Sequence, residues 1–182
     1  MKRLAFALAL FGLIDLAGGD VAGQSRCTFP SDNQRCRSPR GLWEVEWQEP
    51  SGDGRHVLWL KPTPSGTRAK LMEFDRSVDL LWSPDGRALA VTDRAGSSES
   101  VVWVFTGPKL LRRVNVEERL RASLGQLPEI FENGHRYFES LGWSSSDLLR
   151  FRVRAYDSEP GRMYEANFRY HLSDGVSRER LK

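Results

Sequence analysis

The sequence contains few of the residues on which most metal sites and many catalytic sites depend. It has two cysteines and three histidines in 182 residues, and only five lysines contribute to its basic charge. So few cysteines exclude a disulfide-dense mini-protein, and the lack of several long apolar runs excludes a polytopic membrane protein. Hydrophobic residues at 40% and charged residues at 28% are ordinary for a globular chain, so a disordered tail is excluded as well.

Motifs for common chemistries are also missing. No GxSxG, HExxH, P-loop or dinucleotide-binding fingerprint occurs. His56, His135 and His171 lie far apart, and none of them has the spacing of a metal ligand. We therefore expect no metal, no cofactor and no enzymatic activity. A pair of carboxylates brought together only by the fold stays open as an alternative.

The N-terminus has the three-part pattern of a secretory signal peptide. Met1–Arg3 is basic, Leu4–Leu16 is apolar apart from Asp15, and small residues follow as far as Gly23. Cleavage fits after Gly23 and also after Gly19. A buried N-terminal helix or a retained anchor is the alternative interpretation.

This pattern divides the chain into a signal peptide, 1–23, and one exported β-rich domain, 24–182. The apolar run is shorter than the about 20 residues that a membrane-spanning helix needs. We therefore expect the domain to lie in the periplasm or outside the cell, without stable membrane insertion after cleavage. No cysteine follows the small residues directly, so a lipoprotein anchor is not expected.

The two cysteines, Cys27 and Cys36, fit an exported protein. They lie close together just after the signal, in a segment, 24–40, that is otherwise polar and predicted to be irregular. Residues 30–33 favour a turn between them. In an oxidising compartment the two cysteines are expected to form a structural disulfide.

Apolar residues alternate with polar ones over most of the domain, which predicts strands. The expected strands are 43–47, 57–60, 70–74, 78–82, 87–92, 100–105, 110–114, 137–143, 148–156 and 163–172. One helix is expected over 115–127, with Asn115 as its cap, Glu118 as the capping-box partner, and an apolar side that includes Leu124. A further helical turn is expected over 129–132, and residues 176–182 are expected to be frayed.

Two segments of the domain resemble each other, and one of them resembles a known repeat. Leu81–Val91 and Leu141–Phe151 both read as a strand, a Trp-Ser pair, a tight turn and a returning strand. In the first, Pro84, Asp85 and Gly86 are suited to the turn. The run Trp82–Arg87 is similar to the blade hairpin of the TolB-type β-propeller repeat.

That resemblance implies propeller-like blades, but the chain is short for the complete architecture. A closed propeller needs at least four blades, and about 160 residues remain after the signal. The expected fold is therefore mainly β: an antiparallel meander of two or three propeller-blade-like sheets with one short helix. The blades would pack in an open or sandwich-like arrangement, or several chains would assemble.

Two groups of residues are candidates for a binding surface. Arg150, Arg152 and Arg154 would form a stripe on one face of the strand 148–156, either as a solvated face or as a patch for an anionic partner. The six tryptophans are expected to pack in the core, with an aromatic binding platform as the alternative.

Together these features predict a non-catalytic module that binds another protein or an envelope component. Nucleic acid is not an expected partner, because the net charge is only +3 and the protein is expected to be exported. An inhibitor or immunity-type protein that blocks a toxin or hydrolase is the first alternative. A hydrolase with an unrecognised site is the second.

Overall fold

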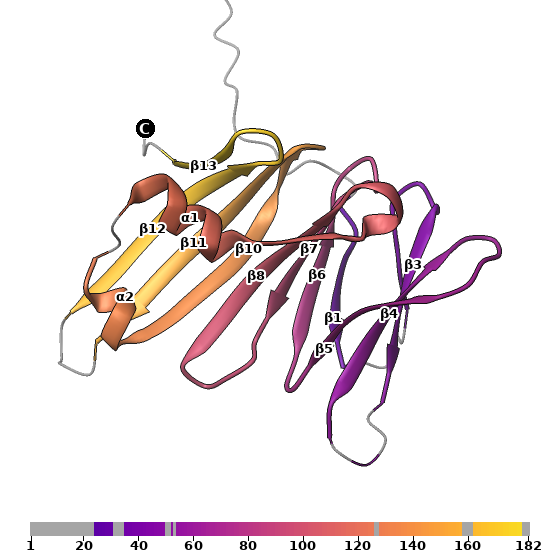
Figure 1. The fold of residues 1–182 in the computed structure, drawn as a ribbon, viewed down its shortest axis with the longest axis horizontal. Coiled ribbons are helices and arrows are strands. Elements are labelled where there is room, and N and C mark those ends of the chain that lie inside the picture. The colour runs from indigo at the N-terminus through magenta and orange to yellow at the C-terminus, as the bar shows by residue number, and fades with distance from the viewer. Residues whose placement is uncertain are drawn as a thin grey trace, which may run out of the picture.

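The computed structural model describes residues 24–30, 35–49, 52, 54–125, 128–157 and 162–179. The expected signal peptide, 1–23, and most of the expected turn at 30–33 lie outside the described residues. The predicted fold class is confirmed: the chain is mainly β and forms one sheet of nine strands and one of four, neither closed into a barrel or propeller. Figure 1 shows the two sheets side by side, with the smaller one at the right.

The small sheet consists of four antiparallel strands in chain order. They are β2 (Arg35–Arg37), β3 (Trp43–Gln48), β4 (His56–Pro62) and β5 (Ala69–Phe74). Alternation places Val45 and Leu60 opposite each other on the buried side, and Glu46 opposite Trp59 on the outer side.

The large sheet follows the order β1-β6-β7-β8-β10-β11-β12-β13, and β9 pairs with β8 away from this path. The strands are β1 (Arg26–Phe29), β6 (Val78–Trp82), β7 (Leu89–Asp93), β8 (Glu99–Thr106), β9 (Arg112–Asn115), β10 (His135–Ser145), β11 (Leu148–Tyr156), β12 (Met163–His171) and β13 (Gly175–Arg178). All pairs are antiparallel except β8 with β10, which align only at Glu99–Arg136 and Ser100–Tyr137. This short parallel contact joins the two halves of the sheet.

Strands β6 to β8 form the middle layer of the molecule, because both of their faces are buried. Leu80 and Trp82 belong to a core shared with the small sheet, whereas Leu81 belongs to a second core shared with β10 to β12 and the helices. Burial on both sides explains why Val78–Trp82 is almost continuously apolar.

Strand β10 crosses over the middle layer as it runs away from β8. The Ser140 hydroxyl lies 2.8 Å from that of Thr92 on β7, and the Trp143 indole N–H donates to the Leu81 carbonyl of β6 at 3.0 Å. Irregular register around Gly142 bends the strand along this path.

The predicted helix is α1 (Val116–Leu124), which packs against β8, β9 and β13. The Asn115 side chain accepts hydrogen bonds from the backbone N–H groups of Glu117 and Glu118, and the helix ends at Gly125. Leu124 does not face the core as expected, since it is 43% exposed. The short segments η1 (Pro108–Leu110) and α2 (Ile130–Asn133) flank this region, α2 close to the expected helical turn at 129–132.

The turn between β6 and β7 forms as its residues predict. Gly86 has a φ of 69°, and the Asp85 carboxylate accepts from the Ser83 hydroxyl at 2.8 Å and from the Arg87 N–H at 3.1 Å. The Ser83 hydroxyl in turn accepts from the Ala88 N–H at 2.9 Å. The turn is therefore fixed by its own side chains.

The expected disulfide is present. Cys27 and Cys36 are bonded, with their Cα atoms 6.0 Å apart, and the bond joins β1 of the large sheet to β2 of the small one. Within the described residues, no helix has both the length and the apolar character needed to cross a bilayer.

Two expectations about the chain ends were wrong. The described residues of segment 24–40 are not irregular throughout, because β1 pairs with β6 and β2 with β3. Residues 176–178 are not frayed, because β13 pairs with β12. These three strands are short and polar, so their order depends on the strands they meet rather than on their own patterning.

Candidate binding surface

The predicted stripe of Arg150, Arg152 and Arg154 lies on the outer face of β11, but its charge is compensated. Arg150 lies 3.2 Å from Glu179, and Arg152 and Arg154 share Glu139 at 2.7 and 3.7 Å. The structure therefore places these arginines in an ion-paired ladder across the sheet, and they offer little free positive charge.

An aromatic cluster lies at the end of this ladder. The Tyr137 and Tyr156 rings meet edge to face with centroids 6.0 Å apart, and the His135 ring, opposite Tyr156 in the strand register, lies 6.4 Å from that of Tyr137. Met163, the residue opposite Tyr156 on β12, is 62% exposed. Aromatic residues and methionine are enriched in protein interfaces, so this end of the sheet has the composition of a contact surface.

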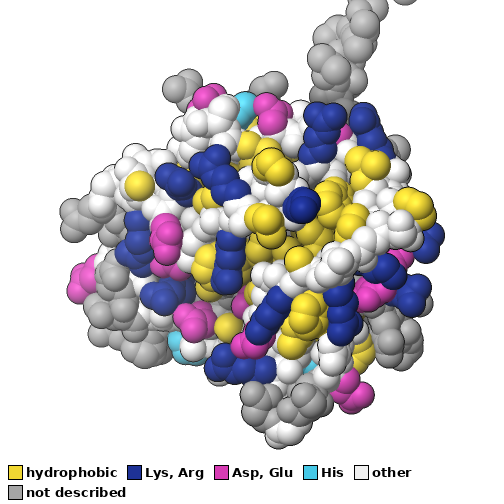
Figure 2. Space-filling view, turned by 45° about the vertical axis from the view of Figure 1, so that its right-hand side comes forward, with side chains coloured by type: hydrophobic (Ala, Val, Ile, Leu, Met, Phe, Trp, Pro, Cys, Tyr) yellow, Lys and Arg dark blue, Asp and Glu magenta, His cyan; other side chains and the backbone are white. Residues whose placement is uncertain are grey.

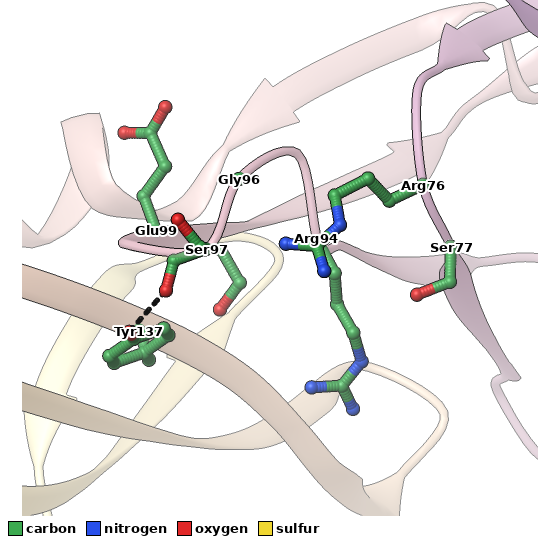
Figure 3. Close-up of a pocket in the computed structure, with 8 residues that line it drawn as sticks. Arg76, Ser77, Arg94, Gly96, Ser97, Glu99 and Tyr137 are labelled. Carbon is green, nitrogen blue, oxygen red and sulfur yellow. Dashed lines mark hydrogen bonds between the residues drawn. The ribbon is translucent and has the colours of Figure 1, made fainter.

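A hollow of about 290 Å³ adjoins the aromatic cluster. It is formed by the β5–β6 loop, the β7–β8 loop and the start of β10, which the β8–β10 contact brings together. Figure 3 shows Arg76 and Arg94 on one side of this hollow and Ser97 and Tyr137 on the other. We call it the loop-end hollow.

The two arginines of the loop-end hollow differ in their partners. Arg94 donates to Asp79 at 2.5 Å, and Asp79 also accepts from the Thr28 hydroxyl at 2.8 Å. Arg76 is exposed, and no residue in the described part of the chain pairs with its guanidinium. The hollow therefore contains one anchored cation and one available cation.

The opposite wall of the hollow is held in place by hydrogen bonds. The Tyr137 hydroxyl donates to the Ser97 carbonyl at 2.7 Å, and the Ser100 hydroxyl donates to the Phe138 carbonyl at 2.9 Å. The Glu99 carboxylate forms an ion pair with the Arg136 guanidinium, with the nitrogen and oxygen 3.2 Å apart. A preformed wall lowers the ordering cost of binding.

A perturbed carboxyl group lies beside this region, at the end of β7. Burial raises the pKa of Asp93 to about 6, with Asp75 and Glu99 adding to the effect and Arg113 opposing it. One carboxylate oxygen of Asp93 is buried without a hydrogen-bond partner among the described residues. Perturbed acids are enriched at functional sites, although ion networks shift them too.

The tryptophans do not form an exposed platform. Trp82 and Trp143 are fully buried, and the other four are half-buried. Trp59 is covered by the Arg68 guanidinium at 4.4 Å, and Trp103 by that of Arg113 at 3.4 Å.

Positive charge is scattered over the visible surface. Figure 2 shows Lys and Arg side chains spread around a central group of hydrophobic ones, not gathered in one basic patch. Recognition of an anionic partner on this face would therefore depend on local sites. In the part of the chain that is described, no cluster of three or more His, Cys, Asp or Glu side chains could hold a metal ion.

Comparison with known proteins gives no relative. No protein-family model, curated protein or solved structure matches this chain. The functional assignment therefore depends on the site itself.

Sequence reasoning did not identify the residues of the loop-end hollow. Arg76 and Arg94 each follow an aspartate, and both lie in polar loops where a strand ends or begins. An Asp-Arg pair at a strand end can mark a charged loop surface. The approach of Arg76 and Arg94 to Tyr137, however, depends on the pairing of β8 with β10, which no local motif indicates.

Proposed function

We propose that this protein is an exported, non-catalytic binding module that recognises an acidic segment of a partner protein. The proposed contact surface comprises Arg76, Arg94, Tyr137, Tyr156 and Met163, and we call it the loop-end surface. The observation that carries the proposal is the guanidinium of Arg76, which has no partner among the described residues, in a preformed hollow beside an exposed Met and two Tyr side chains.

The chemistry of the loop-end surface suits a protein partner. Tyr and Arg dominate the energetically important positions of interfaces, and Tyr137 and Tyr156 present apolar rings with polar tips. Beside them, Arg76 can form a bidentate pair with a carboxylate. A partner segment could place an acidic side chain in the hollow, against Arg76. Apolar side chains next to it in that segment could then pack on the rings of Tyr137 and Tyr156.

Export is supported by two independent features. The N-terminal pattern is that of a secretory signal, and the Cys27–Cys36 disulfide is typical of oxidising compartments. We place the protein in the periplasm or outside the cell.

We also propose that the hairpins are propeller-type blades in an unclosed arrangement. The resemblance of Trp82–Arg87 to the TolB-type repeat supports this, as does the packing of one hairpin layer on each face of β6 to β8. Such blades serve as platforms for many functions, so this part of the proposal concerns the scaffold only.

The alternatives differ in measurable ways. An inhibitor or immunity-type protein would bind a toxin or hydrolase and reduce its activity. A hydrolase would turn over a substrate itself, and replacement of one carboxylate would abolish that turnover.

The proposal is tested by charge reversal in a capture experiment with the exported fraction of the source organism. Wild-type protein should retain a partner at fixed stoichiometry, and Arg76→Glu should lose most of it. Arg87→Glu is the matched control, because Arg87 is 76% exposed and lies in the β6–β7 turn, outside the loop-end surface. Equal capture by both variants would contradict the proposal.

A further inference from the structure

A second hollow, of about 230 Å³, lies between β9, α1 and the β12–β13 turn. We call it the α1–β13 hollow. It is at the far end of β12 from Met163, so it is separate from the loop-end surface. Its polar lining consists of Arg112, Arg119, Ser123, Tyr170, Ser173 and Asp174.

Two cations, Arg112 and Arg119, share this small space. Neither Arg112 nor Arg119 has a carboxylate partner among the described residues, whereas Arg150, Arg152 and Arg154 of the same sheet are all paired. Two unneutralised guanidinium groups around one hollow repel each other, and an anion between them would remove that repulsion.

A tyrosine hydroxyl adds a donor to the two cations. Tyr170 is 4% exposed, yet its hydroxyl has no hydrogen-bond partner among the described residues. Burial raises the pKa of Tyr170, while the positive charges of Arg119 and Arg112 act in the opposite direction. At neutral pH the hydroxyl is therefore protonated and able to donate, with both arginines close to it.

The backbone around the hollow is well fixed. Arg119 lies on α1, which is capped by Asn115 and anchored in the core by the fully buried Leu120. The Ser123 hydroxyl donates to the Arg119 carbonyl at 2.9 Å. The one acidic group of the lining, Asp174, is 78% exposed and lies 3.8 Å from His171, and it forms no ion pair with Arg112 or Arg119.

We propose that the α1–β13 hollow binds a phosphate group. Two guanidinium groups and a hydroxyl supply several donors suited to a tetrahedral oxyanion, and arginine pairs with phosphate in a bidentate manner. The hollow is smaller than the roughly 300–1,000 Å³ of pockets for drug-sized ligands, so it suits one phosphate and little more. The phosphate would be free in solution or carried on a larger molecule as a monoester.

The test is a calorimetric titration of the folded protein with inorganic phosphate and, separately, with glycerol phosphate, at constant ionic strength. Saturable binding is expected. The double variant Arg112→Gln/Arg119→Gln should weaken it by about tenfold or more, because hydrogen bonds to charged groups contribute about 1.5–3 kcal/mol. Tyr170→Phe should weaken it by about threefold, as expected for one neutral donor. The tighter of the two probes identifies whether the site takes free phosphate or a monoester.

The control is Arg87→Gln, which removes the same charge from the β6–β7 turn and should leave the affinity within about twofold of wild type. Far-UV circular dichroism and urea unfolding establish that each variant is folded. Failure of both probes to saturate, or equal affinity in wild type and the double variant, would overturn the proposal. Neither result bears on the loop-end surface, which shares no residue with this hollow.

Discussion

The Tyr137 hydroxyl donates a hydrogen bond to the carbonyl oxygen of Ser97, 2.7 Å away, and so joins the start of β10 to the β7–β8 loop. The two residues are far apart in sequence and meet because β8 and β10 pair briefly in parallel. This bond closes one side of the loop-end hollow (Figure 3). This exposed hydrogen bond is one of several that fix the shape of the proposed contact surface, together with the buried bond from the Ser100 hydroxyl to the Phe138 carbonyl.

Tyr137→Phe should loosen that loop without unfolding the protein. The substitution removes the bond to Ser97 and the 3.2 Å contact of the same hydroxyl with His135 Nδ1. Loss of such exposed hydrogen bonds costs about 0.5–1 kcal/mol, and the amides near Ser97 should exchange faster in hydrogen–deuterium exchange. Tyr156→Phe is the control, because the Tyr156 hydroxyl has no hydrogen-bond partner among the described residues. Unchanged exchange in Tyr137→Phe would show that the bond does not order the loop.

Asp93 should make the protein less stable as the pH rises. Its pKa in the folded protein is about 6, above the ordinary aspartate value of 3.8, so the folded state binds the proton more tightly than the unfolded state does. The free energy of unfolding should therefore decrease between about pH 4 and pH 6 and stay lower above that range. Urea unfolding across this pH range measures the effect.

Asp93→Asn should remove this pH dependence and stabilise the protein at pH 7.5. A shift of this size corresponds to about 3 kcal/mol, which solvent screening at the partly exposed site reduces to about 1–2 kcal/mol. A destabilised variant at pH 7.5 would mean that the ionised carboxylate has a favourable partner.

Gly86→Ala should be more harmful than Gly41→Ala, although both glycines have positive φ, 69° and 66°. Strain alone costs about 1–2 kcal/mol at each position. A Cβ on Gly86 would also lie 3.1 Å from the Ser38 Cβ, whereas one on Gly41 meets nothing within 4 Å. Gly86→Ala should therefore cost roughly 1 kcal/mol more, by overpacking between the two sheets. Equal decreases in the melting temperature of the two variants would rule out a destabilising contact between the new Cβ and Ser38.

Removal of the disulfide should destabilise the protein moderately. Cys27 and Cys36 are nine positions apart, and closing so short a loop contributes about 2–3 kcal/mol. The variant Cys27→Ala/Cys36→Ala should lose that amount in urea unfolding, and reduced wild type should match it. A loss below about 1 kcal/mol would indicate that contacts between the sheets already hold β1 and β2 together.

The strands that the sequence identified best are those whose own residues determine them. The bounds of β6 and β11 match the prediction to the residue. In β6 an apolar run ends at a Ser-Pro-Asp-Gly turn, and in β11 apolar and polar residues alternate over Leu148–Tyr156, so each strand is defined by its own residues. Strands β1, β2 and β13 were missed because they are short, and pairing with another strand orders them.

The candidate site was far less predictable. Arg150, Arg152 and Arg154 were correctly placed on one face, but their neutralisation by Glu139 and Glu179 depends on register between strands. Arg76 and Tyr137 meet only through tertiary structure. Alternation of residues in the sequence predicts which side chains share a face of a strand. It does not predict which loops lie next to each other in the folded chain.

The most direct test of the binding account is site-specific photo-crosslinking in the source organism. A photoreactive amino acid at Met163, on the loop-end surface, is compared with one at Leu124, which is 43% exposed on α1. We expect a discrete crosslinked partner at Met163, weakened by the additional change Arg76→Glu, and none at Leu124. Absence of a partner at Met163, or the same partner at both positions, would contradict the account.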